Sequence, residues 1–368
     1  MTRRLHIVSV SESSISRTSG MGRVAWHWRE EAVRRGHLFT HLGLDDVPEG
    51  TPLRSFPSAV RRRFAQVSEP ADCLLVHEPA SGAFLDVDVP MVVVSHGIER
   101  RLWDLQVQGK AGPRPALRTR LLFPWWRLRG ADRGLSRGAR VYVLNREDYA
   151  FVQARYRRAA DDVFLFRNGV DLEPQTGSTG VPRVVFIGQW RPRKGTAELV
   201  SAMAALAASF PHVRWTLAGT RVGGDTVRMQ CPEAVRDRLD ICPDFSGDEE
   251  RALLADAPVF VLPSLFEGQP LALLQAMAAG CCCVTTNCCG QRDVIVDGVN
   301  GLLVAPGDGG ALTTALARVL GDRALRDRLG AAARASVQDR SWAQVSSEVL
   351  DDLEAFCARR PAGRGHGH

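Results

Sequence analysis

Lysine is almost absent from this sequence, although positive charge is not. Of the 368 residues, 47 are Lys or Arg and 41 are Asp or Glu, which gives a formal net charge of +6. Only two of the 47 basic residues are lysines, Lys110 and Lys194. Each lysine is therefore a candidate for a specific role.

Long hydrophobic runs are also missing. No apolar stretch approaches the ~20 residues that a transmembrane helix needs, and the N-terminus (MTRRLHIVSVSESS) turns polar before an apolar signal-peptide core could form. We therefore expect a cytoplasmic protein whose nine cysteines are reduced. No Cys-x2-Cys pair matches a zinc site, so we expect neither a metal nor another cofactor.

Five of the cysteines lie close together in the second half of the chain. The run at residues 281–283 precedes a valine and predicts a buried strand in which cysteine serves as a small hydrophobic residue. Cys288 and Cys289 are expected in the loop after that strand, where they can be partly exposed.

The excess positive charge is concentrated in one segment. Residues 1–176 contain 27 basic and 20 acidic residues, whereas the rest of the chain contains 20 and 21. Residues 100–146 alone contain 12 basic residues against Asp104 and Asp132. This segment accounts for more than the whole net charge, and it indicates an anionic partner for the first half of the chain.

Short β-branched runs alternate with amphipathic stretches along nearly the whole chain, a pattern typical of α/β domains with helices on both faces of a parallel sheet. The clearest helices are expected at residues 22–35, 196–210 and 341–356. Strands are expected at residues 5–10, 38–42, 73–76, 91–95, 140–144, 163–166, 183–187, 214–218, 259–262, 282–285 and 302–304.

A stretch rich in Pro, Gly, Ser and Thr separates the two halves of this pattern. We expect an N-terminal Rossmann-like domain over residues 1–173, a linker over 174–182, a second such domain over 183–340 and a disordered tail over 359–368. Two doubly wound domains that face each other would place a ligand between the carboxyl ends of their strands.

The most informative segment is residues 259–280. A buried strand leads into a loop with Glu267 and Gly268, and Pro270 stands where a helix would begin. Backbone N–H groups at such a helix start bind anions readily. Gln275 is the single polar residue of the apolar helix and needs a hydrogen-bond partner inside the protein. The pattern fits a site for a phosphate-bearing ligand, and it also fits an ordinary strand–helix turn.

Two further loops have comparable positions. The loop FIGQWRPRKG at residues 186–195 follows a buried strand, and its Arg191, Arg193 and Lys194 could neutralise a diphosphate or form a solvated basic turn. In the first half, His96 closes the strand at 91–95, where a histidine is either structural or part of a ligand site.

Together these motifs resemble those of the retaining glycosyltransferases of family 4, which have the GT-B fold. The resemblance covers about residues 4–355. It rests on FEG at 266–268, QAMAAG at 275–280, the GQWRPRKG turn at 188–195, NGVD at 168–171, SHG at 95–97 and DGVNGLLV at 297–304.

The resemblance implies a GT-B protein, in which two Rossmann-like domains face each other across a cleft. It implies transfer of a sugar from a nucleotide-diphosphate sugar to an acceptor hydroxyl, with retained anomeric configuration and no required metal. Similar enzymes bind the donor mostly on the C-terminal domain and the acceptor mostly on the N-terminal domain, and their last helix, here residues 341–356, packs back on the first domain. A role in polysaccharide or glycolipid assembly at the cell surface is expected.

The resemblance also assigns roles to individual residues. Glu267 matches the glutamate that faces the donor sugar, Lys194 the lysine on the diphosphate, and His96 the histidine at the edge of the donor sugar; these three are the expected catalytic residues. Gly20 and Gly22 match a glycine loop that closes over phosphates or the acceptor. The remaining donor-site residues implied are Gln189, Arg191, Arg193, Gly268, Gln269, Pro270, Leu271 and Gln275.

Two of these positions depart from the family pattern. Gln275 stands where the family has a glutamate that holds the ribose hydroxyls, and Gln189 stands where it has an arginine beside the diphosphate. Gln275 can still bond a diol, but without charge-assisted strength. A protein that binds a nucleotide sugar without turning it over is therefore an alternative.

The basic segment has several interpretations. Leu117, Leu121, Trp125 and Leu128 recur at helical spacing, and Pro124 should break or kink the helix. Such a helix suits an anionic membrane surface or a phosphate-bearing acceptor, and a solvated arginine-rich face has the same composition. No nucleic-acid-binding module accompanies the charge. The residues expected to face the acceptor or the membrane are Arg118, Arg120, Trp125, Trp126, Arg127 and Arg129.

Two other motifs point elsewhere. GMGRVA at 20–25, followed by Asp45 and Asp46, satisfies the fingerprint of an NAD(P)-dependent oxidoreductase. However, nine residues separate the first expected strand from its first glycine, whereas the fingerprint needs the glycines in the tight turn itself. The Asp86-Val87-Asp88 triplet resembles a metal-binding motif of another glycosyltransferase fold, but it precedes a buried strand and is interpreted as a charged strand edge.

Overall fold

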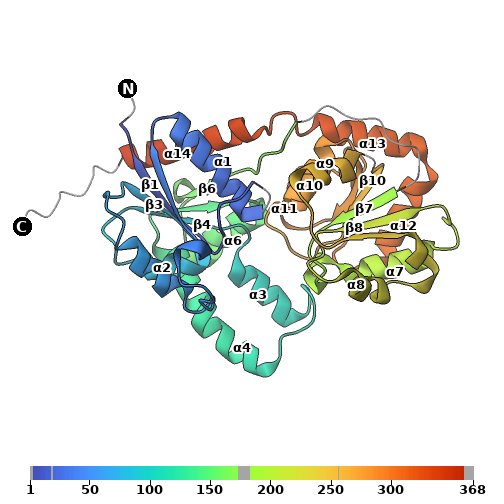
Figure 1. The fold of residues 1–368 in the computed structure, drawn as a ribbon, viewed down its shortest axis with the longest axis horizontal. Coiled ribbons are helices and arrows are strands. Elements are labelled where there is room, and N and C mark those ends of the chain that lie inside the picture. The colour runs from blue at the N-terminus through green and yellow to red at the C-terminus, as the bar shows by residue number, and fades with distance from the viewer. Residues whose placement is uncertain (1–2, 18–19, 173–182, 256, 360–368) are drawn as a thin grey trace, which may run out of the picture. The chain divides into compact units, whose positions relative to one another are not determined.

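The chain divides into two compact units (Figure 1). The computed structural model describes residues 3–17, 20–172, 183–255 and 257–359. Unit 1 consists of Met1–Asp104, Pro115–Gly169 and Trp342–His368, and unit 2 consists of Leu105–Arg114 and Val170–Ser341. The expected linker at 174–182 and residues 360–368 of the expected tail lie outside the described residues.

Unit 1 is built on a six-stranded parallel sheet. Its strands are β1 (His6–Val10), β2 (Leu38–Leu42), β3 (Cys73–His77), β4 (Met91–Val94), β5 (Arg140–Val143) and β6 (Val163–Leu165), in the spatial order β2-β1-β3-β4-β5-β6. β-Branched residues such as Val8, Val76 and Val93 fill the core on this sheet.

Seven helices alternate with these strands or return to them. They are α1 (Gly20–Arg34), α2 (Phe56–Phe64), α3 (Glu99–Gln108), α4 (Leu117–Phe123), α5 (Arg129–Arg137), α6 (Arg146–Tyr156) and α14 (Trp342–Ala358). The last residues of α3, from Leu105 on, are counted with unit 2. α1 buries Val24, Trp28 and Ala32 on one face, and Gly36, at φ +84°, follows it as the amphipathic pattern predicted. The expected break at Pro124 is a wide π-helical turn, Pro124–Leu128, between α4 and α5.

The last helix belongs to unit 1 although it follows unit 2 in sequence, and Figure 1 shows α14 beside α1. Arg35 pairs with Asp351 at 2.7 Å and with Glu354 at 3.0 Å. At the sheet, the Tyr142 hydroxyl donates to Asp352 at 2.6 Å, and Arg140 pairs with the same carboxylate. α14 is therefore attached to unit 1 by polar contacts as well as by its buried apolar face.

Unit 2 repeats the architecture. Its strands are β7 (Arg183–Ile187), β8 (Arg214–Ala218), β9 (Leu239–Cys242), β10 (Val259–Leu262), β11 (Cys282–Thr286) and β12 (Leu302–Val304), all parallel, in the order β12-β11-β10-β7-β8-β9. The helices are α7 (Thr196–Leu206), α8 (Gly224–Gln230), α9 (Gly247–Ala255), α10 (Leu271–Ala278), α11 (Cys289–Val294), α12 (Gly309–Gly321) and α13 (Arg323–Ala335).

The eleven expected strands are all present, with ends within one residue of expectation. The strand that sequence reasoning missed is β9, four residues at the edge of the unit 2 sheet with Asp240 in the middle. An edge strand needs little hydrophobic patterning because one side of it faces solvent. α7 is shorter than the helix expected at 196–210 and ends at Leu206.

The cysteine cluster is buried throughout. Cys281, Cys282 and Cys283 behave as the small hydrophobic residues expected of them. The expectation that Cys288 and Cys289 lie in a partly exposed loop is wrong, because Cys288 is 9% and Cys289 1% exposed and Cys289 begins α11. The sequence shows no apolar periodicity there, so this burial comes from packing of the short α11 on the sheet.

Gly195, between β7 and α7, is required by both backbone and space. It has φ +72°, and a β-carbon there would overlap the carbonyl oxygen of Pro263. We predict that Gly195→Ala lowers the free energy of unfolding by about 3 kcal/mol or more. Urea unfolding measures this, with Gly321→Ala as the control because that position has open space around it. Equal stability of the two variants would contradict the prediction.

Candidate functional site

Two loops of unit 2 meet through an ion pair. Lys194 ends the short 3-10 turn Pro192–Lys194 before α7, and Glu267 follows β10. The Lys194 Nζ lies 2.5 Å from the Glu267 Oε1, although the two residues are 73 positions apart. They meet because β7 pairs with β10 in parallel, so both loops leave the same edge of the sheet.

The pair is largely buried, and this sets its charge state. Burial raises the pKa of the Glu267 carboxyl, but the charges of Lys194 and Arg193 and the hydrogen bond from Lys194 outweigh it, so the pKa lies below its usual value. Glu267 is therefore ionised at neutral pH. A fixed carboxylate and a fixed ammonium stand side by side at the end of the sheet.

Backbone contacts hold the two loops together. The Leu265 N–H donates to the Arg193 carbonyl at 2.8 Å, and the Arg193 guanidinium donates to the Phe266 carbonyl at 3.2 Å. Gly290, in α11, approaches Gly268 so closely that a β-carbon would overlap the Gly268 carbonyl oxygen. The Glu267–Gly268 loop is therefore held on both sides.

This loop leads directly into α10. Gly268, Gln269 and Pro270 are buried, and Pro270 precedes the first helical residue, Leu271. The helix start was expected at Pro270 itself, one residue earlier. Free backbone N–H groups of the first turn make this end of α10 suited to an anion.

Gln275 is buried in α10, as expected for a polar residue in an otherwise apolar helix, and it has a partner. Its Nε2 donates to the Asp171 Oδ2 at 3.1 Å. Asp171 belongs to the NGVD motif at residues 168–171, and the motif itself predicts no role for the aspartate. A glutamate at position 275 would face this carboxylate, so the glutamine and the aspartate form a matched pair.

The remaining cationic candidates of unit 2 differ in exposure. Gln189 and Arg191 are exposed, whereas Arg193 is partly buried beside Glu267. The positive charge near the pair therefore comes from Lys194 and Arg193, with Arg191 accessible to solvent.

Unit 1 has its own hollow at the carboxyl ends of its strands. Ser9 and Ser11 at the end of β1, His77 at the end of β3 and His96 just after β4 line it, together with Met21 of α1. The His77 and His96 ring centroids are 5.6 Å apart. His96 is a predicted site residue and His77 is not, although both stand at the ends of buried strands.

Both histidines are neutral. Burial lowers the pKa of His77 to about 3, helped by the charge of Arg127, and burial with the neighbouring His77 lowers that of His96 to about 3. The Nδ1 of His77 is buried without a hydrogen-bond partner within the described chain. Neutral imidazoles that line a hollow can donate to or accept from hydroxyl groups.

The glycine loop lies at the start of α1. Gly20 is exposed and begins the helix, and Gly22 is buried, with its carbonyl accepting from the Ser16 N–H at 3.3 Å. Arg23 donates to the Arg17 carbonyl at 2.9 Å. The loop therefore borders the hollow that contains Met21 and the two histidines.

Arg127 requires a correction. Its side chain is 11% exposed and pairs with Glu12 at 2.5 Å and with Glu99 at 2.6 Å. The expectation that Arg127 faces an acceptor or a membrane is therefore wrong, because its charge is neutralised inside unit 1. The sequence could not show this, since Glu12 is 115 residues away.

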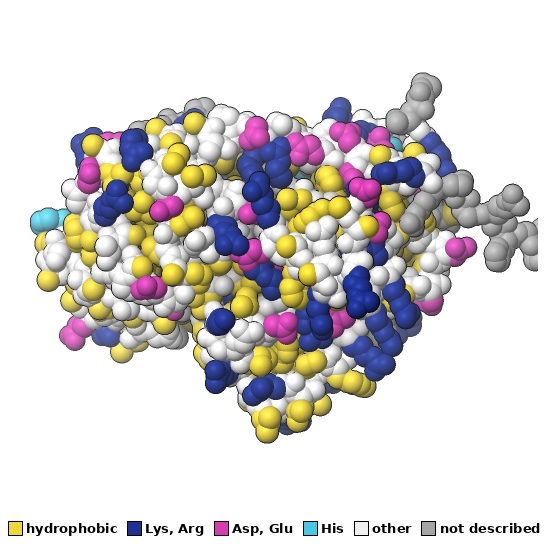
Figure 2. All heavy atoms as spheres, turned by 180° about the vertical axis from the view of Figure 1, so that it is seen from behind, with side chains coloured by type: hydrophobic (Ala, Val, Ile, Leu, Met, Phe, Trp, Pro, Cys, Tyr) yellow, Lys and Arg dark blue, Asp and Glu magenta, His cyan; other side chains and the backbone are white. Residues whose placement is uncertain are grey.

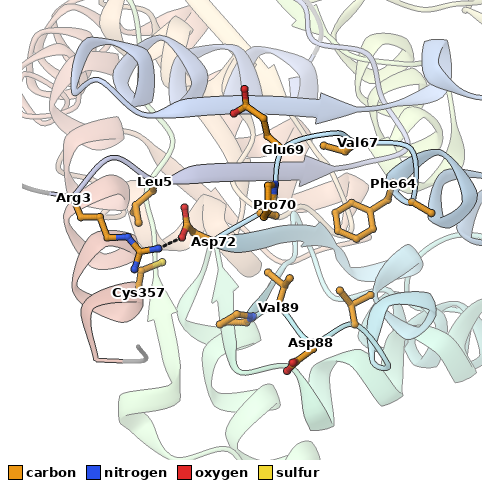
Figure 3. Close-up of a pocket in the computed structure, with 14 residues that line it drawn as sticks. Arg3, Leu5, Phe64, Val67, Glu69, Pro70, Asp72, Asp88, Val89 and Cys357 are labelled. Carbon is orange, nitrogen blue, oxygen red and sulfur yellow. Dashed lines mark hydrogen bonds and ion pairs between the residues drawn. The ribbon is translucent and has the colours of Figure 1, made fainter. Parts of the chain in front are cut away.

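A larger hollow of about 490 Å³ lies at the opposite edge of the unit 1 sheet (Figure 3). Residues that precede β1, β3 and β4 line it, with an ion pair between Arg3 and Asp72 and with Cys357 of α14. Ligands of doubly wound sheets bind at the carboxyl ends of the strands. We therefore place the candidate site of unit 1 at the smaller hollow with the histidines.

Among the described residues, no three His, Cys, Asp or Glu side chains gather as a metal site would require. No described helix is long and apolar enough to cross a membrane.

A family model described as glycosyl transferases group 1 matches residues 181–322, which include Lys194, Glu267 and Gln275. Residues 181–322, most of unit 2, therefore resemble the group 1 glycosyltransferases. The expected histidine and glycine loop of unit 1 lie outside the matched residues.

Curated and solved relatives extend this result. The chain is 31% identical over 222 residues to alpha-maltose-1-phosphate synthase of Mycobacterium tuberculosis, an alignment that covers 53% of this chain and 57% of that protein. Sucrose-phosphate synthase of Thermosynechococcus elongatus superposes with a TM-score of 0.78 at 19% identity, over 97% of this chain and all of that one. Alr3699/HepE of Anabaena, solved in complex with UDP-glucose, has a TM-score of 0.73 at 16% identity, over 96% and 100%.

These relationships settle the fold. The two parallel sheets are the two Rossmann-like domains of the GT-B fold. The chain spans little more than half the length of the Mycobacterium tuberculosis synthase it matches.

The neutral histidines predict an acid-sensitive fold. Because their folded pKa is about 3, against about 6.5 unfolded, the unfolded state binds more protons and stability falls as the pH drops below 6.5. Below pH 6.5, each histidine should lower the free energy of unfolding by about 1.4 kcal/mol per pH unit. Urea unfolding at pH 7 and pH 5 should show this loss reduced in His77→Gln/His96→Gln. His212→Gln is the control at an exposed histidine; an unchanged pH dependence in the double variant would refute the prediction.

The Gln275–Asp171 pair predicts a charge conflict. Gln275→Glu places two carboxylates at hydrogen-bond distance in a buried site, so we expect the free energy of unfolding at pH 7 to fall by about 1–3 kcal/mol. Asp171→Asn added to Gln275→Glu restores a donor–acceptor pair and should recover most of the loss. A double variant no more stable than the single one would contradict this.

Proposed function

We propose that this protein transfers a sugar from a nucleotide-diphosphate sugar to an acceptor hydroxyl. The observation that carries the proposal is the Lys194–Glu267 pair beside the start of α10, which combines a cation and helix N–H groups with a carboxylate. The match of residues 181–322 to the group 1 family model and the likeness to a protein solved with UDP-glucose support it.

The cationic side of the pair suits the diphosphate. Breaking the sugar–phosphate bond builds negative charge on the leaving group, so the site must stabilise that charge. Lys194, Arg193 and the exposed Arg191 supply positive charge, and the first N–H groups of α10 supply dipoles. Since Arg191 is free of the Glu267 contacts, it can compensate for Gln189, which carries no charge.

The acidic side suits the sugar. Because Glu267 is ionised, it accepts hydrogen bonds from two sugar hydroxyls while Lys194 holds it in place. The donor ribose would bond to the Gln275 amide and the Asp171 carboxylate, which together supply the acceptor oxygens that one glutamate would supply.

The reaction retains the anomeric configuration in this proposal. Attack by the acceptor on the face of the leaving phosphate requires no carboxylate nucleophile from the protein. The neutral His77 and His96 of unit 1 would orient hydroxyl groups of a substrate. In this proposal the lysine and the arginines neutralise the leaving diphosphate without a metal ion. An acceptor from polysaccharide or glycolipid assembly fits this chemistry.

The direct test is a panel of nucleotide-diphosphate sugars with different bases and sugars. Release of the nucleoside diphosphate from at least one donor is expected, increased by the matching acceptor. Tight binding of a donor without release across the panel would replace the proposal by a nucleotide-sugar-binding role. If no donor is bound and no nucleoside diphosphate is released, the transfer role and the binding role are both overturned.

Lys194→Ala should lower the transfer rate at saturating donor roughly tenfold or more, because the leaving diphosphate loses its fixed cation. Since this change leaves Glu267 buried without its partner, Lys194→Ala/Glu267→Gln serves to restore stability, and it should remain slow. Arg323→Ala, at an exposed position of α13, is the matched control. Wild-type turnover in a folded Lys194→Ala protein would remove the lysine from the mechanism.

A further inference from the structure

An unusual concentration of exposed apolar side chains lies on α4 and the turn that follows it. Five of the thirteen exposed large hydrophobic residues of the described chain fall within ten positions. Leu117, Leu121 and Trp125 are each 70% exposed, Leu122 is 49% exposed and Trp126 37%. We call these five residues the apolar ridge. Such clustering is expected at an interaction surface, whereas single exposed hydrophobic residues are ordinary.

The ridge is a continuous feature of the helix. Leu117, Leu121 and Trp125 are spaced four residues apart, so they lie on the same side of the helical segment. They face solvent although an amphipathic helix normally turns its apolar residues inward. The apolar side of this helical segment therefore points to solvent, whereas packing within unit 1 would turn it inward.

The opposite side of the segment is fixed to unit 1. Phe123 stacks on Trp103 with ring centroids 4.7 Å apart, and Leu128 is fully buried. Arg127 is held between Glu12 and Glu99. The ridge is therefore displayed on an anchored element, and it cannot bury itself by rotation of the helix without breaking these contacts.

The side chains beside the ridge are cationic. Arg118, Arg120 and Arg129 are exposed, and no acidic residue occurs between Asp104 and Asp132. Within the described part of the chain, none of the three arginines has an ion-pair partner. Figure 2 shows dark blue and yellow side chains together at the lower end of the molecule, where α4 lies in Figure 1.

From this combination we propose that the apolar ridge and its three arginines dock on a membrane surface that carries anionic phospholipids. Leu and Trp side chains enter the boundary between headgroups and acyl chains, and arginines bind lipid phosphates at the same depth. Charge complementarity between the arginines and lipid phosphates favours an anionic membrane over other partners. A second copy of the chain in a two-fold contact would bring arginines against arginines, and nucleic acid offers little to the exposed leucines.

The attachment is peripheral and reversible. Each arginine should strengthen binding roughly fivefold at low salt, and this share is screened as the ionic strength rises. The apolar ridge adds a contribution that salt does not remove. The proposal does not depend on the donor chemistry of unit 2, so it can hold or fail separately from the proposed function.

Co-sedimentation with vesicles tests the proposal on the full chain. We expect binding to vesicles of phosphatidylglycerol and phosphatidylcholine at low salt, roughly tenfold or more weaker binding to phosphatidylcholine alone, and no competition by inorganic phosphate at low concentration. Leu121→Ala/Trp125→Ala should weaken binding at least tenfold at every salt concentration, whereas Arg118→Gln/Arg120→Gln should mainly remove the salt-dependent part.

Matched controls are available elsewhere on the surface. Leu53→Ala/Met229→Ala removes exposed apolar side chains, and Arg62→Gln/Arg63→Gln removes exposed arginines; both should bind as the wild type does. Thermal unfolding verifies that all variants are folded. The proposal is overturned if the protein fails to bind anionic vesicles or if the ridge variants bind as well as the wild type. It is also overturned, in favour of a second copy, if light scattering shows a dimer that dissociates only in the ridge variants.

Discussion

The candidate donor site depends on the ion pair between Lys194 and Glu267, and the pair depends on the parallel pairing of β7 with β10. Two loops 73 residues apart meet because parallel strands deliver their ends to one edge of the sheet. Gly195 is left-handed so that the Lys194 turn can approach Pro263, and Gly290 is small so that α11 can approach Gly268. Within the buried site each charge compensates the other, because an unpaired charge would be costly there.

The same rule of parallel sheets gives unit 1 a site with different electrostatics. Its histidines are neutral, and the nearby charge of Arg127 is neutralised by ion pairs with Glu12 and Glu99. An uncharged polar hollow suits hydroxyl groups, whereas the cation and helix N-terminus of unit 2 suit a diphosphate. The two units therefore differ in the chemistry of their candidate sites, and the exposed charge of residues 118–129 belongs to neither of them.

Much of this arrangement could be predicted from local sequence pattern. Buried parallel strands are continuous apolar runs, which is why eleven of them were predicted within one residue, and the polar Gln275 in an apolar helix had to find a partner. The features that the sequence did not predict have a weaker hydrophobic pattern or no motif. β9 is a short edge strand with little apolar signal, His77 carried no motif of its own, and the burial of Cys288 and Cys289 comes from packing without periodicity.

The sequence by itself determined the two α/β domains, their strands and the loops that hold the candidate site residues, because these follow from the period and hydrophobicity of neighbouring residues. Only the tertiary structure decided which of those residues touch. It paired Gln275 with Asp171, placed His77 beside His96, and buried Arg127 while leaving Arg118 and Arg120 exposed. These arginines have similar local sequence, but whether their charge is neutralised or exposed depends on partners far away in the chain, such as Glu12, which local spacing does not encode.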